Sequence, residues 1–542
     1  MKTITGGEAI IAVLEALGVK QVFGIVSVHN IPILDAVSLS SKISLVECRH
    51  EQGAIHAADG YARATGQIGV AITSTGPGAA NAMGGLFEAY NASSPVLMIT
   101  GQVESDAYGR GQGALHQAEN QLLMLQTVTC RTAHISQHSE IVRTLISVVA
   151  DMRSGRNRPA AIEIPIDIQY QTGEISPFEI KQSPHIKPPM KAIKEAVKLL
   201  NSAVRPLILA GGGVIASGAT NELVAFAEIL EAPVLTTVEG RGSISENHRL
   251  ALGPNTDLAI FNSMIADADV VFAIGTRFQQ NNNTHKVMRF EGTLIHLDID
   301  SEMLGRVHRP EVAILGDARI GLTELMLGLR KKQSNEEWTQ RADFLREAAV
   351  SEARDTIGKD LRAILDSIEA LIPDNSIIVK DATISAYLWA NRLLKVFQPR
   401  SVMRPTSMAI GPGLPLAIGA ASATNQPTVV IQGDGGLMLS IGELATVVQQ
   451  RLPIVVCVFN DSGYGILRFI QNLTVNGRHT GVDLVTPRFA EVALAFGMKA
   501  KYVVDPQGFA EAFDEAISSG EPWLLDIDLT KMTPMEIRTQ KT

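Results

Sequence analysis

The chain is poor in cysteine, and this scarcity excludes one broad class of protein. Only three cysteines occur among 542 residues, Cys48, Cys130 and Cys457, and they form no Cys-x-x-Cys pair. A disulfide-stabilised secreted fold is therefore not expected. Cys48 and Cys457 stand in apolar, strand-like runs, so the sequence predicts buried free thiols in a reducing compartment.

Long basic runs and long apolar runs are also missing. The formal net charge is -9 and no run of Lys and Arg occurs, which argues against a nucleic-acid partner. Near the N-terminus, Thr5 and Glu8 form a capping-box pattern ahead of an apolar helix that ends at Gly18 and is interrupted by Glu15. This stretch is too short for a membrane span and does not resemble a signal peptide, so we expect a cytoplasmic protein with no membrane partner.

Glycine is abundant, with 46 residues, and the chain is 46% hydrophobic and 19% charged, which suits a soluble α/β protein. Short apolar strands alternate with Gly turns and helices almost throughout, which is typical of parallel sheets covered by helices. The length and a Pro-bearing linker at 176–189 predict an α/β fold of three doubly wound parallel-sheet domains, at residues 1–178, 190–345 and 360–542.

The most informative motif lies in the third of these domains. The apolar run Val429–Gln432 leads into Gly433-Asp434-Gly435-Gly436, and a second apolar run, Ile454–Phe459, leads into Asn460-Asp461-Ser462-Gly463-Tyr464-Gly465. With a helix to about Arg451 between them, the two runs form a βαβ unit, so both strand ends lie on one edge of the sheet. Asp434 and Asp461 then lie side by side and suit a divalent cation that carries a diphosphate.

This pattern resembles the cofactor signature of thiamine diphosphate (ThDP) enzymes, a family of decarboxylases and carboligases. That family usually closes the motif with Asn-Asn, whereas this chain has Asp461, which is one negative charge richer. The resemblance implies pyrimidine-binding, middle and diphosphate-binding domains in chain order, and ThDP with Mg²⁺ as cofactors. The metal would take side-chain oxygens of Asp434 and Asp461 and the carbonyl oxygen of Gly463. The implied cofactor contacts in this motif are Gly433, Asp434, Gly435, Gly436, Asp461, Tyr464, Gly465 and Ile466.

In the first domain, Arg49-His50-Glu51 enters a helix that we expect to run to about Thr65. A Glu in the first turn of a helix is by default a surface residue that stabilises the helix dipole. The surrounding sequence, with Gly60-Tyr61-Ala62-Arg63, resembles a ThDP-family segment. In that family this Glu hydrogen-bonds the aminopyrimidine and promotes deprotonation of the thiazolium carbon, so the resemblance implies Glu51 as a catalytic residue and cofactor contact.

Three further turns match cofactor-contacting segments of the same family. Thr75 and Gly76 lie in a Gly-rich turn after a strand, which on its own could be any anion-binding loop or a plain βα turn. Ile384 and Ser385 follow the strand Ile377–Val379 and imply donors to the diphosphate. Met408 and Ile410 imply a backbone partner for the amino group and an apolar support beneath the bent cofactor, although an apolar turn before a buried helix explains them equally well.

Two histidines stand in loops where the family places substrate-handling residues. His29 lies in Val26–Asn30, where acetolactate synthases usually carry Tyr-Pro-Gly-Gly and benzaldehyde lyase carries a histidine. His116 falls where many relatives have a substrate-facing Gln. A lone loop histidine is usually a solvated polar residue, but two of them at such positions favour catalytic residues that relay protons to the substrate.

The middle domain departs from acetolactate synthase after Arg277-Phe278, where Gln279 to Asn283 replace the acidic residues of the FAD-binding segment. This puts bound FAD in doubt, and with it a strict acetolactate synthase assignment. Gly211-Gly212-Gly213 after a strand is a weak nucleotide signal that a vestigial Rossmann turn explains as well.

Together these features predict a ThDP- and Mg²⁺-dependent enzyme that makes or breaks a C–C bond beside a carbonyl. The substrate would be a 2-oxo acid, as in acetolactate synthase-like decarboxylation and carboligation, or a 2-hydroxy ketone or 2-hydroxyacyl compound, as in benzaldehyde lyase-like cleavage. A catalytically silent, regulatory ThDP-binding paralogue is the third hypothesis. The resemblance also implies a homodimer or homotetramer with active sites at the subunit interface.

Overall fold

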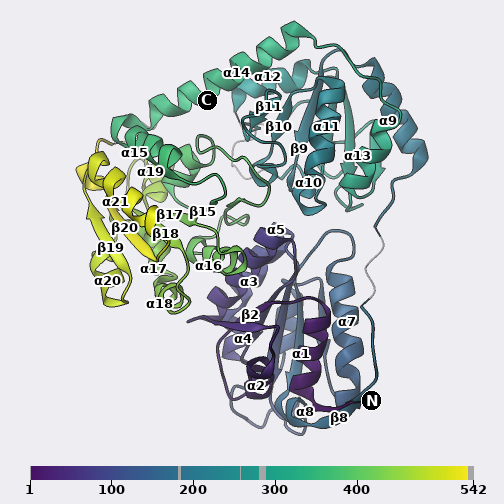
Figure 1. Ribbon diagram of the computed structural model, residues 1–542, viewed down its shortest axis with the longest axis vertical. Helices are drawn as coiled ribbons and strands as arrows, with labels where there is room; N and C mark the ends of the chain where they lie inside the picture. The colour runs from purple at the N-terminus through teal and green to yellow at the C-terminus, as the bar shows by residue number, and fades with distance from the viewer. Residues whose placement is uncertain (1, 181–184, 257, 280–287, 535–542) are drawn as a thin grey trace. The chain divides into compact units, whose positions relative to one another are not determined.

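The computed structural model describes residues 2–180, 185–256, 258–279 and 288–534, and its strands form three six-stranded sheets and one two-stranded sheet. The chain divides into two compact units. The first unit comprises residues 1–183, 376–384 and 403–531, and the second comprises residues 184–375, 385–402 and 532–542. The first and third sheets belong to the first unit, and the middle sheet belongs to the second (Figure 1).

The first sheet has the strand order β3-β2-β4-β5-β7-β6, and its paired strands all run parallel. Its strands are β2 (Gln21–Gly24), β3 (Ser44–Glu47), β4 (Gly69–Thr73), β5 (Val96–Gln102), β6 (Arg131–His134) and β7 (Ala160–Pro165). The flanking helices are α1 (Gly6–Ala16), α2 (Ile31–Leu39), α3 (Glu51–Thr65), α4 (Pro77–Asn81), α5 (Met83–Ala92), α6 (Gln121–Gln126), η1 (His138–Glu140), α7 (Ile141–Met152) and α8 (Ile166–Tyr170). A separate antiparallel pair joins β1 (Lys2–Thr5) to β8 (Thr172–Ile175).

The middle sheet has the order β11-β10-β9-β12-β13-β14, also with parallel pairs, so its first strand is central and the chain winds outward in both directions. Its strands are β9 (Pro206–Ala210), β10 (Val234–Thr236), β11 (Ala251–Gly253), β12 (Val270–Ile274), β13 (Thr293–Asp298) and β14 (Val312–Leu315). Its helices are α9 (Met190–Ser202), α10 (Gly212–Ala216), α11 (Thr220–Leu230), η2 (Val238–Gly240), α12 (Ala259–Asp267) and α13 (Ala318–Met326). The second unit also holds α14 (Glu336–Thr356), α15 (Gly358–Leu371) and the π-helical turn η3 (Ala386–Ala390).

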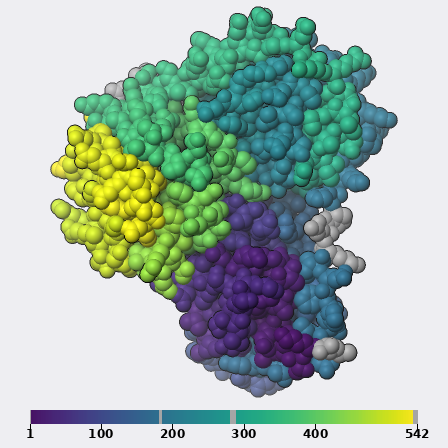
Figure 2. All heavy atoms as spheres, in the orientation of Figure 1, coloured from purple at the N-terminus to yellow at the C-terminus, as the bar shows by residue number. Residues whose placement is uncertain are grey.

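The third sheet has the order β16-β15-β17-β18-β20-β19, and the pairs from β15 to β19 run parallel. Its strands are β15 (Ile377–Lys380), β16 (Val402–Met403), β17 (Thr428–Gly433), β18 (Ile454–Asn460), β19 (Lys499–Val503) and β20 (Trp523–Asp528). Its helices are α16 (Gly413–Thr424), α17 (Asp434–Met438), η4 (Ile441–Glu443), α18 (Leu444–Gln449), α19 (Gly465–Thr474), α20 (Phe489–Ala495), α21 (Pro506–Ser519) and η5 (Leu529–Lys531). In the space-filling view, the yellow atoms of the C-terminal part of this domain form a continuous surface (Figure 2).

Helices α3 and α16 join the first and third sheets within the first unit. Their backbones approach so closely that a Cβ added at Gly60 would lie 2.0 Å from the carbonyl oxygen of Leu416. A Cβ at Gly419 would lie 1.8 Å from the carbonyl oxygen of Ala57. Apolar side chains from both sheets then share one continuous core around these helices. Glycine at the contact therefore lets the two domains bury a common apolar interface.

Three α/β domains with parallel sheets confirm the predicted fold class, and the thiols of Cys48 and Cys457 are buried and free as expected, while Cys130 is exposed. The domain boundaries predicted from the sequence stay a prediction. The expected helix to about Arg451 is instead divided into α17, η4 and α18. Among the described residues, the helices include none with the length and apolar character that crossing a membrane requires.

Candidate active site

Asp434 and Asp461 meet at the carboxyl edge of the third sheet. Asp434 is the first residue of α17 and Asp461 follows β18, the strand that pairs in parallel with β17. The Asp434 carboxylate is buried and accepts a hydrogen bond of 2.8 Å from the amide of Gly463. Burial and, to a lesser extent, the charge of Asp434 raise the pKa of Asp461 to about 6. The predicted juxtaposition of two carboxylates is therefore present, and a divalent cation would relieve their repulsion.

Arg468 is a member of this site that the sequence did not reveal. Its Nη1 lies 3.1 Å from the Oδ2 of Asp461, and its Nε lies 2.7 Å from the Oδ1 of Asp483. The guanidinium, which Asp461 shares with Asp483, offsets part of the extra negative charge that distinguishes Asp461 from the asparagine usual in the resembled family. That surplus charge is the one sequence signal that could have prompted a search for a nearby cation.

The turns predicted to hold a diphosphate converge beside the two carboxylates. A Cβ added at Gly433 would lie 2.9 Å from Thr383 Oγ1, and one added at Gly465 would lie 2.8 Å from Ile384 Cδ1. The segment that contains Thr383 and Ile384 therefore passes the C-terminal end of β17 and the N-terminal end of α19. Among the described residues, no cluster of three or more His, Cys, Asp and Glu side chains could hold a metal. Two carboxylates with backbone carbonyls suit Mg²⁺, which usually takes its other ligands from phosphate and water.

The buried carboxylate of Asp381 holds the next turn in place. It accepts the amide of Gly411 at 2.9 Å and the side-chain amide of Gln432 at 3.1 Å. A Cβ at Gly436 would lie 2.4 Å from Asp381 Oδ2 and 3.5 Å from Ile410 Cγ2, so Ile410 lies next to the start of α17. Ile410 therefore lies beside the turn that begins with Asp434, and its predicted support of the cofactor stays a prediction.

Met408 adopts a left-handed backbone conformation with φ of 66°, which is uncommon for a non-glycine residue and marks a constrained turn. The two preceding residues are held by Glu88 of α5, whose carboxylate accepts the amides of Thr406 at 2.6 Å and Ser407 at 2.9 Å. The turn that carries Met408 and Ile410 is therefore fixed from the first domain.

Ser385 follows Ile384 directly, but the two residues fall in different compact units. The Ser385 hydroxyl is buried and has no hydrogen-bond partner among the described residues. A buried hydroxyl without a partner costs free energy, so a ligand acceptor fits this position. The predicted contact of Ile384 and Ser385 with the diphosphate stays a prediction.

Glu51 is the first residue of α3, at the place that the sequence predicts. Its Oε2 accepts a hydrogen bond of 3.0 Å from Asn81, and a Cβ at Gly78 would lie 3.0 Å from its Oε1. Its carboxylate therefore faces α4, directly after the turn that leaves β4. Glu443 of the third domain also accepts the amides of Arg49 at 2.9 Å and His50 at 3.1 Å, so it caps the N-terminus of the helix that carries Glu51.

Thr75 and Gly76 occupy this same turn, and both are tied to the interior. The Thr75 hydroxyl donates 2.9 Å to Gln121 Oε1, which also accepts the Gly76 amide at 2.8 Å. The Thr75 side chain is therefore satisfied within the protein. The cofactor contact predicted for Thr75 and Gly76 stays a prediction that would have to use the backbone.

His29 and His116 come together, with ring centroids 5.5 Å apart. His29 is buried, whereas His116 is exposed, and its Nδ1 lies 3.5 Å from the hydroxyl of Ser74. Burial lowers the pKa of His29, and the charge of His116 lowers it further. Ser74 in turn contacts Ser27 at 2.8 Å, and a Cβ added at Gly78 would meet both the Ser74 Cβ at 2.7 Å and Glu51 Oε1 at 3.0 Å. The first domain therefore gathers both histidines and Glu51 around one turn.

In the middle domain, close backbone packing explains the glycine run without a ligand. The amide of Gly211 donates to the carbonyl of Ile274 at 2.8 Å, and that of Gly213 donates to the carbonyl of Gly275 at 3.0 Å. A Cβ at Gly211 would lie 2.3 Å from the Gly275 oxygen. The segment on which the FAD prediction depends, residues 280–283, lies outside the described residues.

Comparison with known proteins defines the class first. The chain matches the N-terminal TPP binding domain of thiamine pyrophosphate enzymes over residues 4–124, their central domain over 193–325 and their C-terminal TPP binding domain over 384–527. These matches follow the order of the three sheets, and the chain belongs to the acetolactate synthase-like thiamine pyrophosphate enzymes.

The similar proteins carry both decarboxylase and carboligase names. A probable acetolactate synthase large subunit of Methanocaldococcus jannaschii is 36% identical over 98% of this chain and 93% of that protein. A probable 2-ketoarginine decarboxylase of Pseudomonas aeruginosa is 33% identical over 93% of this chain and 90% of that protein. The acetolactate synthase isozyme 2 large subunit of Escherichia coli is 29% identical over 98% and 96%, respectively. The chain is thus an enzyme of the thiamine-dependent carboligase and decarboxylase type.

Proposed function

We propose that this enzyme uses ThDP and Mg²⁺ to decarboxylate a 2-oxo acid and to join the remaining fragment to a second carbonyl compound. The observation that carries the proposal is the pair Asp434 and Asp461 at the carboxyl edge of the third sheet. The amide of Gly463 donates a hydrogen bond to the Asp434 carboxylate beside this pair. The acetolactate synthase names among the relatives support the carboligation step.

The residues divide into a cofactor end and a substrate end. Asp434, Asp461 and the Gly463 carbonyl would hold Mg²⁺, and the amides of Gly435, Gly436 and Gly465 would face the diphosphate. Ile410 would support the cofactor rings from below. When bound, ThDP supplies a carbanion that adds to a carbonyl and stabilises the negative charge left when the adjacent C–C bond breaks.

Glu51 would hold a proton at the aminopyrimidine nitrogen. Because Glu51 would not be a metal ligand, it could take up and release this proton without leaving the metal. His29 would be neutral near pH 7, because burial lowers its pKa. It could therefore accept a proton from a substrate hydroxyl. His116 is exposed and 5.5 Å away, ring centre to ring centre, so it could exchange that proton with solvent.

The histidine pair also favours a second candidate function, cleavage of a 2-hydroxy ketone or 2-hydroxyacyl compound. That reaction begins with removal of a hydroxyl proton, and a neutral buried imidazole suits this step. Decarboxylation does not need such a base. The second candidate therefore rests on His29 and His116 rather than on the metal pair.

Turnover by the reconstituted protein tests both functions. The protein would be stripped of cofactor, loaded with ThDP and Mg²⁺, and assayed for CO₂ release and acyloin formation from a panel of 2-oxo acids. Parallel assays would measure aldehyde release from 2-hydroxy ketones and 2-hydroxyacyl-CoA compounds. CO₂ release with acyloin formation supports the main proposal, and aldehyde release alone supports the lyase. Binding without turnover across the panel would overturn both and favour a regulatory paralogue.

We also propose a homodimer or homotetramer whose active sites combine the first domain of one subunit with the third domain of its partner. Helix α19 follows the predicted metal turn and has no buried residue in the single chain. Its apolar residues Leu467, Ile470 and Leu473 are exposed there, so a partner subunit could cover them. Mixing Glu51→Gln with Asp434→Asn protein, each inactive alone, gives one intact site per heterodimer if the sites are shared. Absence of any restored activity after subunit exchange would count against shared sites.

A further inference from the structure

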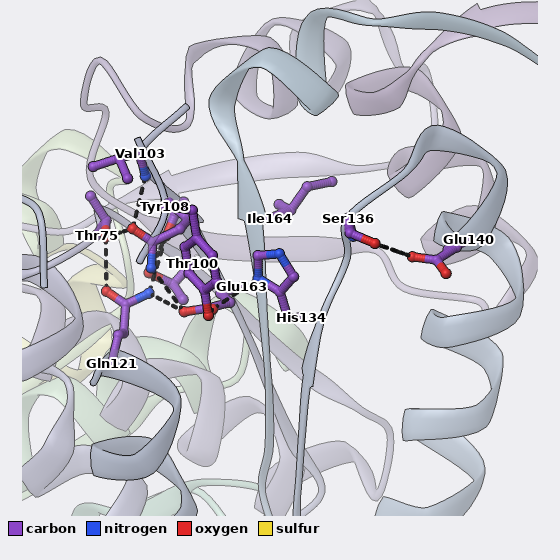
Figure 3. A network of polar contacts seen from close by, with 12 residues as sticks. Thr75, Thr100, Val103, Tyr108, Gln121, His134, Ser136, Glu140, Glu163 and Ile164 are labelled. Carbon is purple, nitrogen blue, oxygen red and sulfur yellow. Dashed lines mark hydrogen bonds and ion pairs between the residues drawn. The ribbon is translucent and has the colours of Figure 1, made fainter. Parts of the chain in front are cut away.

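Glu163 forms the centre of a buried polar network in the first domain (Figure 3). This carboxylate lies on β7 and is fully buried. Its Oε2 accepts hydrogen bonds from the side-chain amides of Gln121 at 2.9 Å and Gln102 at 3.1 Å. Its Oε1 lies 2.9 Å from both the Tyr108 hydroxyl and His134 Nδ1. Because an ionised carboxylate only accepts, all four partners act as donors.

The network joins the two ends of one loop. Residues 103–120 connect β5 to α6 without regular secondary structure and carry His116. Tyr108 binds Glu163 near the start of this loop, and Gln121 binds it immediately after the end. The Tyr108 ring also stacks on His134, with centroids 4.3 Å apart. One carboxylate therefore binds a residue near each end of the loop that carries His116.

The same network also fixes the turn against which His116 rests. Gln121 uses its amide nitrogen for Glu163 and its Oε1 for the Gly76 amide at 2.8 Å. A Cβ at Gly76 would lie 2.1 Å from the carbonyl oxygen of His116, so the two backbones are in close contact. Glu163 thus reaches His116 along two routes, through the loop and through the turn.

We infer that Glu163, acting through Tyr108 and Gln121, is a positioning residue for His116. This inference rests on the proposed role of His116 at the substrate. Tyr108 and Gln121 hold the loop to a carboxylate that the strand residues Gln102 and His134 also contact, so the anchor itself is fixed. Displacing His116 by 1 Å would weaken its contact with the substrate but leave Glu51 and the metal pair in place.

Tyr108→Phe is the sharpest variant, because it removes one hydroxyl and keeps the ring that stacks on His134. A matched control is Tyr502→Phe, which also removes a phenol that donates to a carboxylate, that of Asp528, far from this loop. Glu163→Leu is the second variant. It removes both acceptor oxygens, so Tyr108 and Gln121 both lose their carboxylate partner.

Two measurements test the inference. In cofactor-free protein, trypsin cleavage after the exposed Arg110 should accelerate on the order of tenfold in Tyr108→Phe and Glu163→Leu, and less than twofold in Tyr502→Phe. In Tyr108→Phe enzyme loaded with ThDP and Mg²⁺, kcat/KM should fall roughly tenfold relative to wild type. The ThDP Kd and the rate of cofactor C2 proton exchange should stay within about twofold of the wild-type values. In a His116→Ala background, Tyr108→Phe should change kcat/KM no further, because the two residues act through one step.

Unchanged cleavage after Arg110 would overturn the inference whether or not the enzyme turns over. Faster cleavage with unchanged kcat/KM would also overturn it, since the loop would then be loosened without consequence for His116. Faster cleavage in a protein with no turnover on any substrate would support the restraint by Glu163 and overturn the proposed function instead.

Discussion

Glu88 offers the most demanding test of how the first domain holds the cofactor turn of the third. Its carboxylate is fully buried, and each oxygen accepts two donors. One oxygen accepts Arg63 and the Thr406 amide, each at 2.6 Å, and the other accepts the amide and hydroxyl of Ser407. In Glu88→Gln, either orientation of the new amide places its NH₂ against a backbone N–H that cannot turn away.

The expected cost is about 3 kcal/mol of local stability. A hydrogen bond to a charged group contributes about 1.5–3 kcal/mol, and breaking a buried ion pair costs about 3–5 kcal/mol. The lower end applies, because Arg63 keeps a two-pronged contact with Asp59 at 2.9 and 2.8 Å. Burial raises the pKa of Glu88, but Arg63 and Ser407 lower it by more, so the folded-state pKa lies below 4.5. This stabilisation is complete above pH 4.5 and is lost as the pH falls through the folded-state pKa.

Hydrogen exchange at the Thr406 and Ser407 amides measures this effect locally, which matters because a chain of several domains has no single unfolding free energy. A loss of about 3 kcal/mol predicts exchange roughly a hundredfold faster near pH 7. Glu443→Gln is the matched control, because the Thr446 hydroxyl can turn to the Glu47 carbonyl and accept from the new amide. If Glu88→Gln accelerates exchange no more than this control does at its own amides, the reasoning from donor geometry is wrong.

Three further predictions concern the site. Glu51→Gln should keep the fold and ThDP binding but slow cofactor C2 proton exchange by about 10²–10⁴-fold; exchange equal to that of the Glu47→Gln control would remove its assigned role. Arg468→Gln should tighten Mg²⁺ binding about fivefold, because Asp461 loses a competing cation that is partly exposed; weaker binding in a Mg²⁺ titration would mean that Arg468 orients Asp461 instead. His29→Asn should make Tm fall less steeply as the pH drops below 6.5. The lowered pKa of buried His29 contributes stability that is fully present above pH 6.5 and is lost as the pH falls through the folded-state pKa. A dependence of Tm on pH equal to that of wild type contradicts this.

The sequence predicted the central strands well and the edges poorly. The predicted runs Ile377–Val379 and Ile454–Phe459 fall within the central strands β15 and β18, because central strands are buried on both faces and read as apolar runs. β6 and β14 were missed. β6 has the sequence Arg131-Thr132-Ala133-His134 and lies at a sheet edge, so burial does not impose an apolar pattern on it. The three-residue β11 is too short to show any periodicity.

The candidate site shows the same division between local and distant information. Asp434, Asp461 and Glu51 were predictable because each stands at the end of a strand or the start of a helix, and chain order fixes where these points lie in a parallel sheet. Glu88 and Glu443 were not, because their partners are far along the chain: Glu88 contacts Ser407, and Glu443 contacts Arg49. No local pattern distinguishes such a carboxylate from an ordinary surface glutamate.

Asp461 and Arg468 join the two kinds of information. The departure from the usual asparagine is visible in the sequence, but the compensating cation emerges only when α19 folds back beside the turn at Gly463, where a Cβ would lie 2.1 Å from Arg468 Nη2. Arg468 pairs with Asp483 as well as with Asp461, so its guanidinium offsets only part of the additional negative charge. The substitution at Asp461 therefore comes with a neighbouring cation of its own, and by itself it is no argument against the proposed Mg²⁺ site.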